Sequence, residues 1–453
     1  MENDMEDTIV AVSTALSKSA ISIVRASGPE AIAIVSQIFK GKDLKTAESH
    51  TISYGHIVDG DEIIDEVLVS VFRAPKTYTT EDIVEINCHG GMYVTNRILG
   101  LLLEKGGRTA EPGEFTKRAF LNGRIDLTQA EAVTDLIDAK TSSSLKMANL
   151  GLRGDIRKMI EDFRSRLLTC MAKIEVNIDY PEYLDEEQIN GEILKPAVRE
   201  MLNEITKILD KSKVSAILKE GISTAIIGKP NVGKSSLLNA LLREDRAIVT
   251  DIAGTTRDTI EGTANLGGLV LNLIDTAGIR QTTDTIERIG VEKAKKIIDR
   301  AALIILVFDY STPLTEDDYR ILELTEKKER IIVVNKQDLK KQIDLSRLKD
   351  YQLISAFNQA DIEKLENKIR TVCQISDLVD LDYTYVGNAR QIAKLKQAKD
   401  SLEDALSGIE NRQPSDIVNL DLTAAWKILG EIIGETVEDE LVSEMFSKFC
   451  LGK

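Results

Sequence analysis

Short runs of apolar residues, separated by polar segments, predict a domain of strands and helices near the N-terminus. Such runs cover 20–25, 66–73 and 82–87, and each has the length and composition typical of a β-strand. A helix-like patch covers 30–39, between the first two runs. We therefore expect a small α+β domain over 1–120.

Helical periodicity replaces this pattern after Asp126. The segment 128–131 reads Thr-Gln-Ala-Glu and predicts a helix start, in which the Thr128 hydroxyl caps the first turn and the Glu131 carboxylate returns the bond. Apolar stripes follow, and the spacings within each stripe place its residues on one helical face. The stripes are Ile160, Phe163, Leu167, Met171 and Ile174; Val198, Leu202, Ile205 and Leu209; and Ile392, Leu395, Leu402, Leu406 and Ile409. They predict an all-α domain composed of 121–218 and 378–453.

Between the two helical parts, apolar runs alternate with helical patterns. The runs cover 224–227, 269–274, 303–308 and 331–334. Strands that alternate with helices predict βαβ units and a parallel sheet. We therefore expect an inserted α/β domain over 219–377, because insertion is tolerated where both ends of the inserted part leave at one surface. The fold class is then multidomain.

The composition fits several buried cores and makes the average surface acidic. Of the 453 residues, 43% are hydrophobic, and the formal net charge is −16. An acidic surface repels phosphate, so contact with nucleic acid requires a local basic patch or a partner protein.

The spacing of the cysteines and the length of the longest apolar run indicate the cellular compartment of the protein. Cys88, Cys170, Cys373 and Cys450 are widely spaced without a CxxC pair, which disfavours a disulfide scaffold or a zinc site. The acidic start does not resemble a signal or transit peptide, and the apolar run 301–308 is too short to span a bilayer. These features predict a cytoplasmic protein without a membrane partner.

One segment predicts a phosphate-binding loop. Residues 228–235 read Gly-Lys-Pro-Asn-Val-Gly-Lys-Ser and fit the pattern GxxxxGK[ST]. They follow the apolar run 224–227 and precede a predicted helix over 236–242. In such a loop the backbone N–H groups surround the phosphates, Lys234 reaches the β and γ oxygens, and the Ser235 hydroxyl ligates Mg²⁺.

Three later segments predict that the nucleotide is GTP. Residues 275–278, Asp-Thr-Ala-Gly, fit DxxG, whose Asp can hold the Mg²⁺ shell and whose Gly amide can meet the γ-phosphate. Residues 335–338, Asn-Lys-Gln-Asp, fit NKxD, and the Asp carboxylate can accept two hydrogen bonds from guanine that adenine cannot supply. Residues 355–357, Ser-Ala-Phe, match the last guanine-side loop, with Phe where Lys is common.

The segment between the phosphate loop and DxxG predicts a switch. Residues 250–258 read Thr-Asp-Ile-Ala-Gly-Thr-Thr-Arg-Asp, and Thr256 would complete Mg²⁺ coordination in the triphosphate state. A solvated polar loop is the alternative. Ile279 stands where Ras-like enzymes have the Gln that orients water. The candidate replacements are Asp284 and Glu287, whose carboxylates could align water, and Arg288, which could neutralise phosphate charge. The alternative is an exposed charged start of a helix.

Together these motifs resemble the Era-like branch of the TRAFAC GTPases, and the whole chain resembles the MnmE (TrmE) family of tRNA-modification GTPases. Beyond the GTPase motifs, the resemblance rests on segments 7–11, 111–123, 129–133, 254–258 and 449–453. Departures are slight: Leu451 stands where Ile is usual, and 13–16 reads Ser-Thr-Ala-Leu where a Pro-containing loop is common.

The resemblance implies which residues bind and hydrolyse GTP. Lys234, Gly278 and Glu287 are the implied catalytic groups, and Glu287 is the acid that aligns water. The implied GTP contacts are Asn231, Val232, Gly233, Lys234, Ser235, Ser236, Thr250, Asp251, Ile252, Ala253, Gly254, Thr255, Thr256, Asp275, Thr276, Ala277, Gly278, Asn335, Lys336, Asp338, Ser355, Ala356 and Phe357.

The resemblance also implies two metal ions. Ser235 and Thr256 would hold Mg²⁺. K⁺ would replace an arginine finger, which is physically reasonable because positive charge is needed only where phosphate charge develops. Its implied ligands are Asn231, Thr250, Ile252 and Thr255.

A tetrahydrofolate derivative, 5-formyl or 5,10-methylene, is the ligand implied for the N-terminal domain. Arg25, Glu85, Arg124 and Lys453 would contact it, since a pterin needs a carboxylate acceptor and the glutamate part needs cations. Without the resemblance each of these residues would be read as a surface charge. Cys450 is either a buried C-terminal thiol or a candidate functional thiol beside the folate.

The family function implied is wobble-uridine modification. GTP hydrolysis would drive a conformational cycle with the flavoprotein MnmG (GidA), which carries FAD and uses NADH, in a heterotetramer or larger complex. A carboxymethylaminomethyl or aminomethyl group would be installed at carbon 5 of the uridine in certain tRNAs. A homodimer through the N-terminal domain and GTP-dependent dimerisation of the GTPase domain are implied as well. The alternatives are an Era-like ribosome-assembly GTPase and a stand-alone folate enzyme regulated by GTP.

Overall fold

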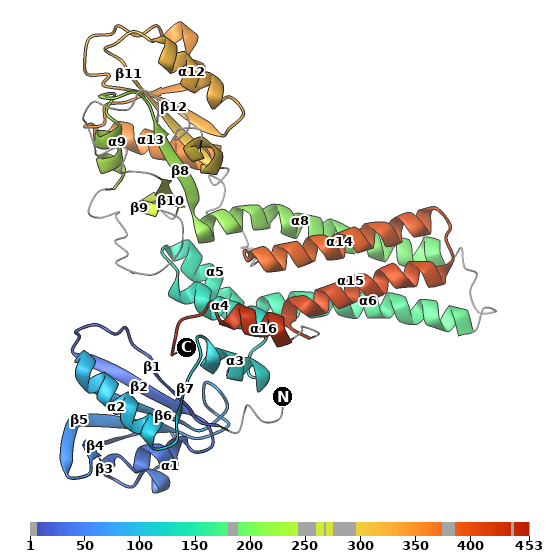
Figure 1. The fold of residues 1–453 in the computed structure, drawn as a ribbon. Helices are drawn as coiled ribbons and strands as arrows, with labels where there is room; N and C mark the ends of the chain where they lie inside the picture. Colours follow the sequence, from blue (N-terminus) through green and yellow to red (C-terminus); the bar gives the residue numbers. More distant parts are fainter. Residues whose placement is uncertain are drawn as a thin grey trace. The chain divides into compact units, whose positions relative to one another are not determined.

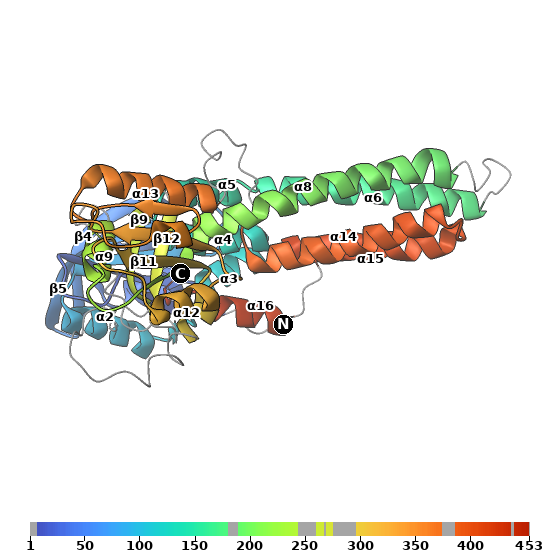
Figure 2. The same cartoon turned by 90° about the horizontal axis from the view of Figure 1, so that it is seen from above.

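The chain divides into two compact units that are described separately below. The computed structural model describes residues 7–179, 189–242, 260–266, 269–274, 296–373, 386–435 and 439–452. The first unit is Met1–Thr134, Gly151–Tyr180 and Asn419–Lys453, and the second is Asp135–Leu150 and Pro181–Val418. Figure 1 labels the elements of both units, and Figure 2 shows the same ribbon from above. In the described parts of the chain, each helix is too short or too polar to span a bilayer.

The N-terminal domain of the first unit is built on one sheet. Its elements are β1 (Ile9–Val12), β2 (Ile21–Ser27), α1 (Ala31–Ser36), β3 (Phe39–Gly41), the 3₁₀ turn η1 (Leu44–Thr46), β4 (Thr51–Asp59), β5 (Glu62–Phe72), β6 (Ile83–His89), α2 (Met92–Glu104) and β7 (Arg108–Thr109). The strand order is β3-β4-β5-β6-β2-β1-β7, and all neighbours are antiparallel except β1 and β7. The predicted runs fall on β2, β5 and β6, so the α+β prediction is confirmed.

This sheet buries one face and leaves part of the other open. Helices α1 and α2 cover the buried face, and their apolar side chains share one core with the strands (Figure 1). Because successive side chains of a strand point to opposite faces, the alternating pattern sends every second residue away from the helices. Exposed apolar side chains on that other face are Ile21, Ile52, Tyr54 and Leu68.

The helical part of the first unit is made mostly of five helices. They are α3 (Glu114–Leu121), α4 (Leu127–Ile137), α6 (Asp155–Asp179), α15 (Ser415–Ile433) and α16 (Asp439–Phe446). The first predicted stripe, on α6, is buried except for the half-buried Met171. Figure 1 shows α15 running alongside α6.

The predicted cap of α4 is wrong. Asp126, not Thr128, caps the helix: its Oδ1 accepts from the backbone N–H groups of Thr128 at 2.7 Å and Gln129 at 3.0 Å. The Gln129 side-chain oxygen accepts from the Asp126 N–H at 3.0 Å. Asp126 and Gln129 therefore form a reciprocal capping box, two residues before the predicted pair. The Thr128 hydroxyl donates to the same carboxylate at 2.6 Å instead of capping.

Arg164 joins α6 to α15. Its guanidinium lies over the Trp426 ring, 4.1 Å from the centroid, and it pairs with Glu435 at 2.5 Å. A Cβ at Gly430 would lie 3.3 Å from the guanidinium. Cation–π contact and charge pairing therefore hold a nearly buried arginine between the two helices.

The helical part of the second unit contains α5 (Ser142–Leu152), the π-helical turn η2 (Ile189–Leu194), α8 (Lys195–Glu220) and α14 (Ala389–Glu410). Helices α8 and α14 pack side by side (Figures 1 and 2). Their predicted stripes are buried or half-buried, which confirms the helical interpretation of both segments.

The inserted domain of the second unit is a doubly covered, mostly parallel sheet. Its elements are β8 (Ile222–Ile227), α9 (Lys234–Leu241), β9 (Ile260–Leu266), β10 (Leu269–Ile274), β11 (Leu303–Asp309), α12 (Glu316–Leu324), β12 (Arg330–Asn335), the 3₁₀ turn η3 (Leu345–Arg347), β13 (Tyr351–Leu353) and α13 (Gln359–Val372). The order is β13-β12-β11-β8-β10-β9, with only β9 antiparallel to its neighbour. Helices α9 and α13 share the core on one face, and α12 packs into the core on the other. The α/β prediction, and with it the multidomain fold class, is confirmed.

Candidate nucleotide site and N-terminal pocket

Parallel strands bring the nucleotide motifs to one edge of the second sheet. The segment 228–235 follows β8, Asn335 ends β12, and Ser355 comes shortly after β13. The carboxyl ends of neighbouring parallel strands lie at the same edge, where ligands bind in open α/β sheets. The described motifs therefore meet although they are far apart in the sequence.

Two glycines give the phosphate loop its shape. A Cβ at Gly228 would lie 2.3 Å from the Val307 carbonyl oxygen, and a Cβ at Gly233 would lie 2.1 Å from Nδ2 of Asn335. Gly233 also has a φ of 96°, a conformation that other residues rarely adopt. The loop can therefore pass this close to β11 and to the end of β12 only because glycine stands at both positions.

Lys234 begins α9 and turns its ammonium group into the loop. Its Nζ donates to the carbonyl oxygens of Gly228 at 2.8 Å and Lys229 at 2.6 Å. Burial lowers the pKa of this ammonium below its ordinary value. The positive charge is thus held within the curve of the loop, where phosphate oxygens are expected.

The Asn335 side chain ties three motif segments together. Its Nδ2 donates to the Val232 carbonyl at 3.0 Å, and its Oδ1 accepts from the Ala356 N–H at 3.0 Å. The neighbouring Lys336 donates to the Asn231 carbonyl at 2.7 Å. The phosphate loop and the two guanine-side segments therefore form one hydrogen-bonded assembly.

Asp338 and Phe357 are exposed at this assembly, and Phe357 is 85% exposed. The buried Asp361 joins the two segments that carry these residues. Its carboxylate accepts from the Ser355 N–H at 3.0 Å and from the Gln337 side chain. Sequence analysis did not single out Asp361. The available signal was the spacing Asn358-x-x-Asp361 at the start of α13, which resembles a helix-capping pattern.

Several predicted site residues lie outside the described residues. Among the GTP, Mg²⁺ and K⁺ contacts these are Thr250 to Thr256 and Asp275 to Gly278. Glu287 and Lys453 lie outside as well. In the parts of the chain that are described, no group of three or more His, Cys, Asp or Glu could hold a metal ion. Of the two implied Mg²⁺ ligands, the structure describes Ser235, beside Lys234 at the start of α9.

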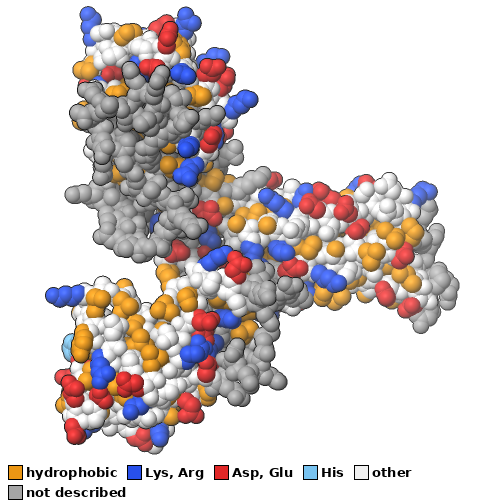
Figure 3. Space-filling view, viewed as in Figure 1, with side chains coloured by type: hydrophobic (Ala, Val, Ile, Leu, Met, Phe, Trp, Pro, Cys, Tyr) orange, Lys and Arg blue, Asp and Glu red, His pale blue; other side chains and the backbone are white. Residues whose placement is uncertain are grey.

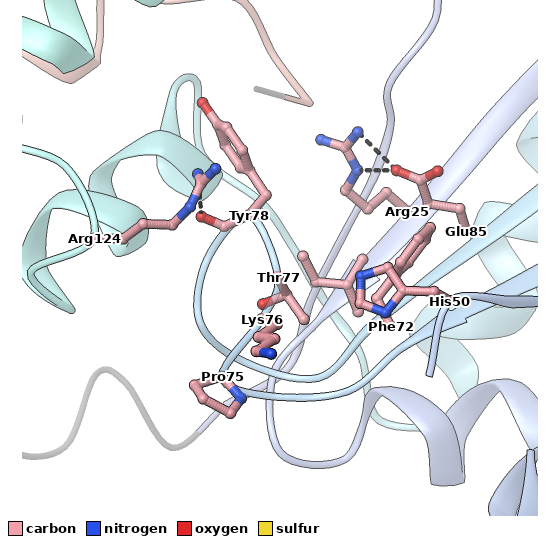
Figure 4. Close-up of a pocket in the computed structure, with 10 residues that line it drawn as sticks. Arg25, His50, Phe72, Pro75, Lys76, Thr77, Tyr78, Glu85 and Arg124 are labelled. Atoms are coloured by element: carbon pink, nitrogen blue, oxygen red, sulfur yellow. Dashed lines mark hydrogen bonds and ion pairs between the residues drawn. The ribbon is translucent and has the colours of Figure 1, made fainter. Parts of the chain in front are cut away.

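A cavity of about 440 Å³ lies in the N-terminal domain, on the face away from α1 and α2. It is lined by Arg25, His50, Phe72, Pro75, Lys76, Thr77, Tyr78, Ile83, Glu85 and Arg124 (Figure 4). The described residues that were implied for folate therefore share one cavity. It carries four basic or imidazole side chains but a single carboxylate.

Sheet register places the acidic group of this pocket. Arg25 on β2 lies directly opposite Glu85 on β6, and Arg25 Nε donates to the carboxylate at 2.8 Å. Across the cavity, Arg124 donates to the Tyr78 carbonyl at 2.9 Å, and its guanidinium lies 4.9 Å from the Tyr78 ring centroid (Figure 4). The pocket thus has a carboxylate on one side and an aromatic ring with a cation on the other.

A buried ionic cluster anchors the loop that carries Tyr78. Arg118, only 2% exposed, donates to Glu81 at 3.0 Å, to the Asp7 carbonyl at 2.9 Å and to Glu114 at 3.2 Å. Burial opposes ionisation of Glu114, but hydrogen bonds from Arg108 and the Glu111 N–H outweigh it and hold the pKa of that carboxyl below its usual range. Arg118 therefore holds the loop between β5 and β6 in place through its bond to Glu81.

The C-terminal segment reaches Arg25. The Gly113 N–H donates to the Cys450 carbonyl at 3.2 Å, and the Arg25 guanidinium donates to the Gly452 carbonyl at 3.3 Å. Gly452 has a φ of 84°, and a Cβ there would lie 2.4 Å from the Val12 carbonyl oxygen. Cys450 is exposed, so the expectation of a buried thiol is wrong.

Comparison with known proteins gives the family. Residues 127–450 match the model of the MnmE helical domain, and residues 8–124 match that of the GTP-binding protein TrmE N-terminus. The chain belongs to the MnmE family of tRNA modification GTPases. The MnmE of Streptococcus thermophilus (strain CNRZ 1066) is 53% identical over 449 residues, covering 99% of this chain and 98% of that one. The MnmE of Bacillus cytotoxicus is 52% identical over 455 residues and 99% of both chains.

Membership in the MnmE family makes the chain a GTP-hydrolysing enzyme that acts in tRNA modification, with tRNA as substrate. It favours this function over an Era-like ribosome-assembly GTPase. Among solved structures, the G domain of the T. maritima FeoB iron transporter is 28% identical, covering 34% of this chain and 99% of its own, with a TM-score of 0.26.

Proposed function

We propose that this MnmE family member is a potassium-stimulated GTPase that acts with the FAD-dependent protein MnmG (GidA). Together they would install an aminomethyl or carboxymethylaminomethyl group at carbon 5 of the wobble uridine of certain tRNAs. The carbon would come from a tetrahydrofolate derivative held in the N-terminal pocket. The observation that carries this proposal is that one chain combines a GTP motif set with a pocket lined by Arg25, Glu85 and Arg124.

In the proposed GTP site, Lys234 binds the phosphates while Ser235 and Thr256 hold Mg²⁺. Glu287 aligns water. The Gly278 amide meets the γ-phosphate, and K⁺ supplies the charge of an arginine finger. Its proposed ligands are Asn231, Thr250, Ile252 and Thr255. The phosphate loop supports the assignment of Lys234, because the ammonium already lies inside the loop curve.

The chemistry of the N-terminal pocket suits a folate. Its volume of about 440 Å³ is in the usual range for small-molecule sites. Glu85 can accept hydrogen bonds from the pterin, and the Tyr78 ring offers a flat surface for it. Arg124 and Lys76 can bind the carboxylates of the glutamate part. Lys453 is proposed to approach the same ligand, since the segment before it already contacts Arg25.

Arg124→Ala is expected to weaken binding of 5-formyltetrahydrofolate about tenfold or more, because a hydrogen bond between charged groups contributes roughly 1.5–3 kcal/mol. Glu85→Gln should weaken it too, through loss of the acceptor charge. Calorimetric titration of the purified full chain measures both. The exposed Arg153 provides the control, and Arg153→Ala should bind as the wild type does. Wild-type affinity in both pocket variants would remove the pocket from the proposal.

Partners are proposed from the family and from the open sheet face. In register, Tyr54, Leu68, Asn87 and Ile23 form one row across that face. An apolar face such as this open sheet face suits a homodimer contact. Figure 3 shows the other side of the domain, which carries α2 and also exposes hydrophobic side chains. We also propose that the GTPase domains pair when GTP is bound and that the protein is cytoplasmic. The complex with MnmG would be a heterotetramer or larger, with FAD and NADH on that partner.

The proposed domain limits are 1–120 for the folate-binding and dimerisation domain, 121–218 and 378–453 for the helical domain, and 219–377 for the GTPase domain. The exposed Cys450 is proposed as a functional thiol beside the folate, because the carbonyl of Gly452, two residues later, accepts from Arg25, which lines the pocket.

Nucleoside mass spectrometry of tRNA tests the function. Cells that lack the chain should lose the modified wobble uridine, and expression of the wild-type chain should restore it. Expression of the Lys234→Ala variant serves as the matched control and should not restore it. A nucleoside profile unchanged by loss of the chain would contradict the modification function while leaving GTP hydrolysis intact.

A further inference from the structure

Asp309 is a buried carboxylate at the edge of the sheet where the nucleotide motifs meet. It ends β11, directly opposite Asn335 in the register of β12, and is 7% exposed. Its Oδ1 accepts from the Ser311 N–H at 2.8 Å and the Ser311 hydroxyl at 2.7 Å. Its Oδ2 accepts from Nζ of Lys336 at 2.6 Å. The two oxygens thus have separate tasks, one within its own turn and one toward the guanine-side motif.

Lys336 relays this contact to the phosphate loop. The same Nζ that binds Asp309 also donates to the Asn231 carbonyl at 2.7 Å. Lys336 and Asn231 both have a φ of 64°, in the left-handed region that residues other than glycine seldom adopt. Such a backbone persists only where its surroundings hold it. The chain of contacts from Asp309 through Lys336 is one such restraint on Asn231.

The charge of Asp309 is needed for this restraint. Burial opposes ionisation of the carboxyl, but the hydrogen bonds from Lys336 and Ser311 outweigh it and keep the pKa below its ordinary value. An ionised oxygen draws the ammonium of Lys336 toward the end of β11 and so orients its remaining protons. A neutral amide at this position would present N–H groups to the ammonium and release it.

We propose that Asp309 is a positioning residue for the potassium site: through Lys336 it fixes the backbone of Asn231 and thereby the side chain that is proposed to bind K⁺. This inference rests on the proposed function, in which Asn231 is a potassium ligand. It assigns to Asp309 no contact with nucleotide or metal.

Asp309→Asn tests the inference with little change of shape, because the retained oxygen can still accept from Ser311. GTP hydrolysis by the full-length chain is measured at saturating GTP while K⁺ replaces Na⁺ at constant ionic strength. We expect the K⁺ concentration for half-maximal stimulation to rise at least severalfold, with a smaller change in the rate at saturating K⁺. Asp309→Glu, which keeps the charge but moves it, should lie between the variant and the wild type.

Asp344→Asn is the matched control. Asp344 makes the same turn, since its Oδ1 accepts from the Ser346 N–H at 3.0 Å and the Ser346 hydroxyl at 2.7 Å, but it is exposed and its carboxylate pairs with Arg347 instead of Lys336. Its variant should keep the wild-type potassium curve. An unchanged curve for folded Asp309→Asn, whatever its thermal stability, would overturn the inference. If Asp309→Asn does not fold, Asp309→Glu decides, and an unchanged curve there has the same meaning. Equal wild-type rates in K⁺ and Na⁺ would instead refute the potassium proposal itself, and the inference with it.

Discussion

Lys234→Ala is expected to lower the rate constant of GTP hydrolysis by roughly a hundredfold or more, the usual cost of removing one preorganised donor to transition-state charge. The ammonium is half-buried and held by two loop carbonyls, so it meets the phosphates without prior rearrangement of the loop backbone. Single-turnover release of phosphate, with enzyme in excess of GTP, measures the chemical step directly.

Lys340→Ala is the control for Lys234→Ala. Lys340 is exposed and lies in the same unit, so its loss removes an equal charge from the surface. The control should hydrolyse GTP at the wild-type rate. Hydrolysis by Lys234→Ala within a factor of a few of the wild type would show that the loop binds phosphate in another way.

Asp338→Asn is expected to weaken GTP binding by roughly a hundredfold, because two hydrogen bonds to a charged acceptor are lost at about 1.5 kcal/mol each or more. The exposed position of the carboxylate leaves it open to a base. Xanthosine triphosphate should bind the variant better than GTP does, since its carbonyl at position 2 can accept from the new amide. Competition titrations with both nucleotides give the ratio.

Asp317→Asn provides the comparison for Asp338→Asn, because Asp317 is also exposed in this unit but lies in the first turn of α12. It should retain the wild-type preference for GTP. Retained preference for GTP in Asp338→Asn would place guanine recognition elsewhere, whereas equal weakening of both nucleotides would indicate that the loop itself had moved.

Secondary structure and fold class were predictable because the spacing of apolar residues is a local property of the chain. The runs 269–274 and 303–308 coincide with β10 and β11 within one residue. The start of α4 was not predictable in the same way. Both Asp126-x-x-Gln129 and Thr128-x-x-Glu131 fit a reciprocal cap, and the sequence offers no reason to prefer the first. Only the path of the chain before the helix decides which residue stands outside it.

The motifs of the nucleotide site could be recognised in the sequence, but the contacts that join them could not. The Asn335 side chain bonds to Val232, 103 residues earlier, and to Ala356, 21 residues later. Such contacts depend on strand order, which periodicity does not specify. Asp361 and Asp309 escaped notice for the same reason, because each carboxylate acts on a loop from a different strand or helix.

In the pocket of the N-terminal domain, too, some lining residues could be predicted from the sequence and others could not. Arg25, Glu85 and Arg124 were implied by family resemblance, whereas Lys76 and Tyr78 carry no pattern that marks them. They line the cavity because the ionic cluster around Arg118 holds their loop against the sheet. Residues of this kind become visible only when a three-dimensional fold brings a loop beside a strand.

The contact between Arg164 and Trp426 provides an optical probe. Trp426 is the only tryptophan among the 453 residues, so selective excitation of indole reports one point of the chain. A guanidinium 4.1 Å from the ring centroid makes the emission sensitive to separation of α6 from α15. A spectrum that stays constant while nucleotide is exchanged would therefore mean that these two helices move as one piece, and a shifted spectrum would time their separation without any added dye.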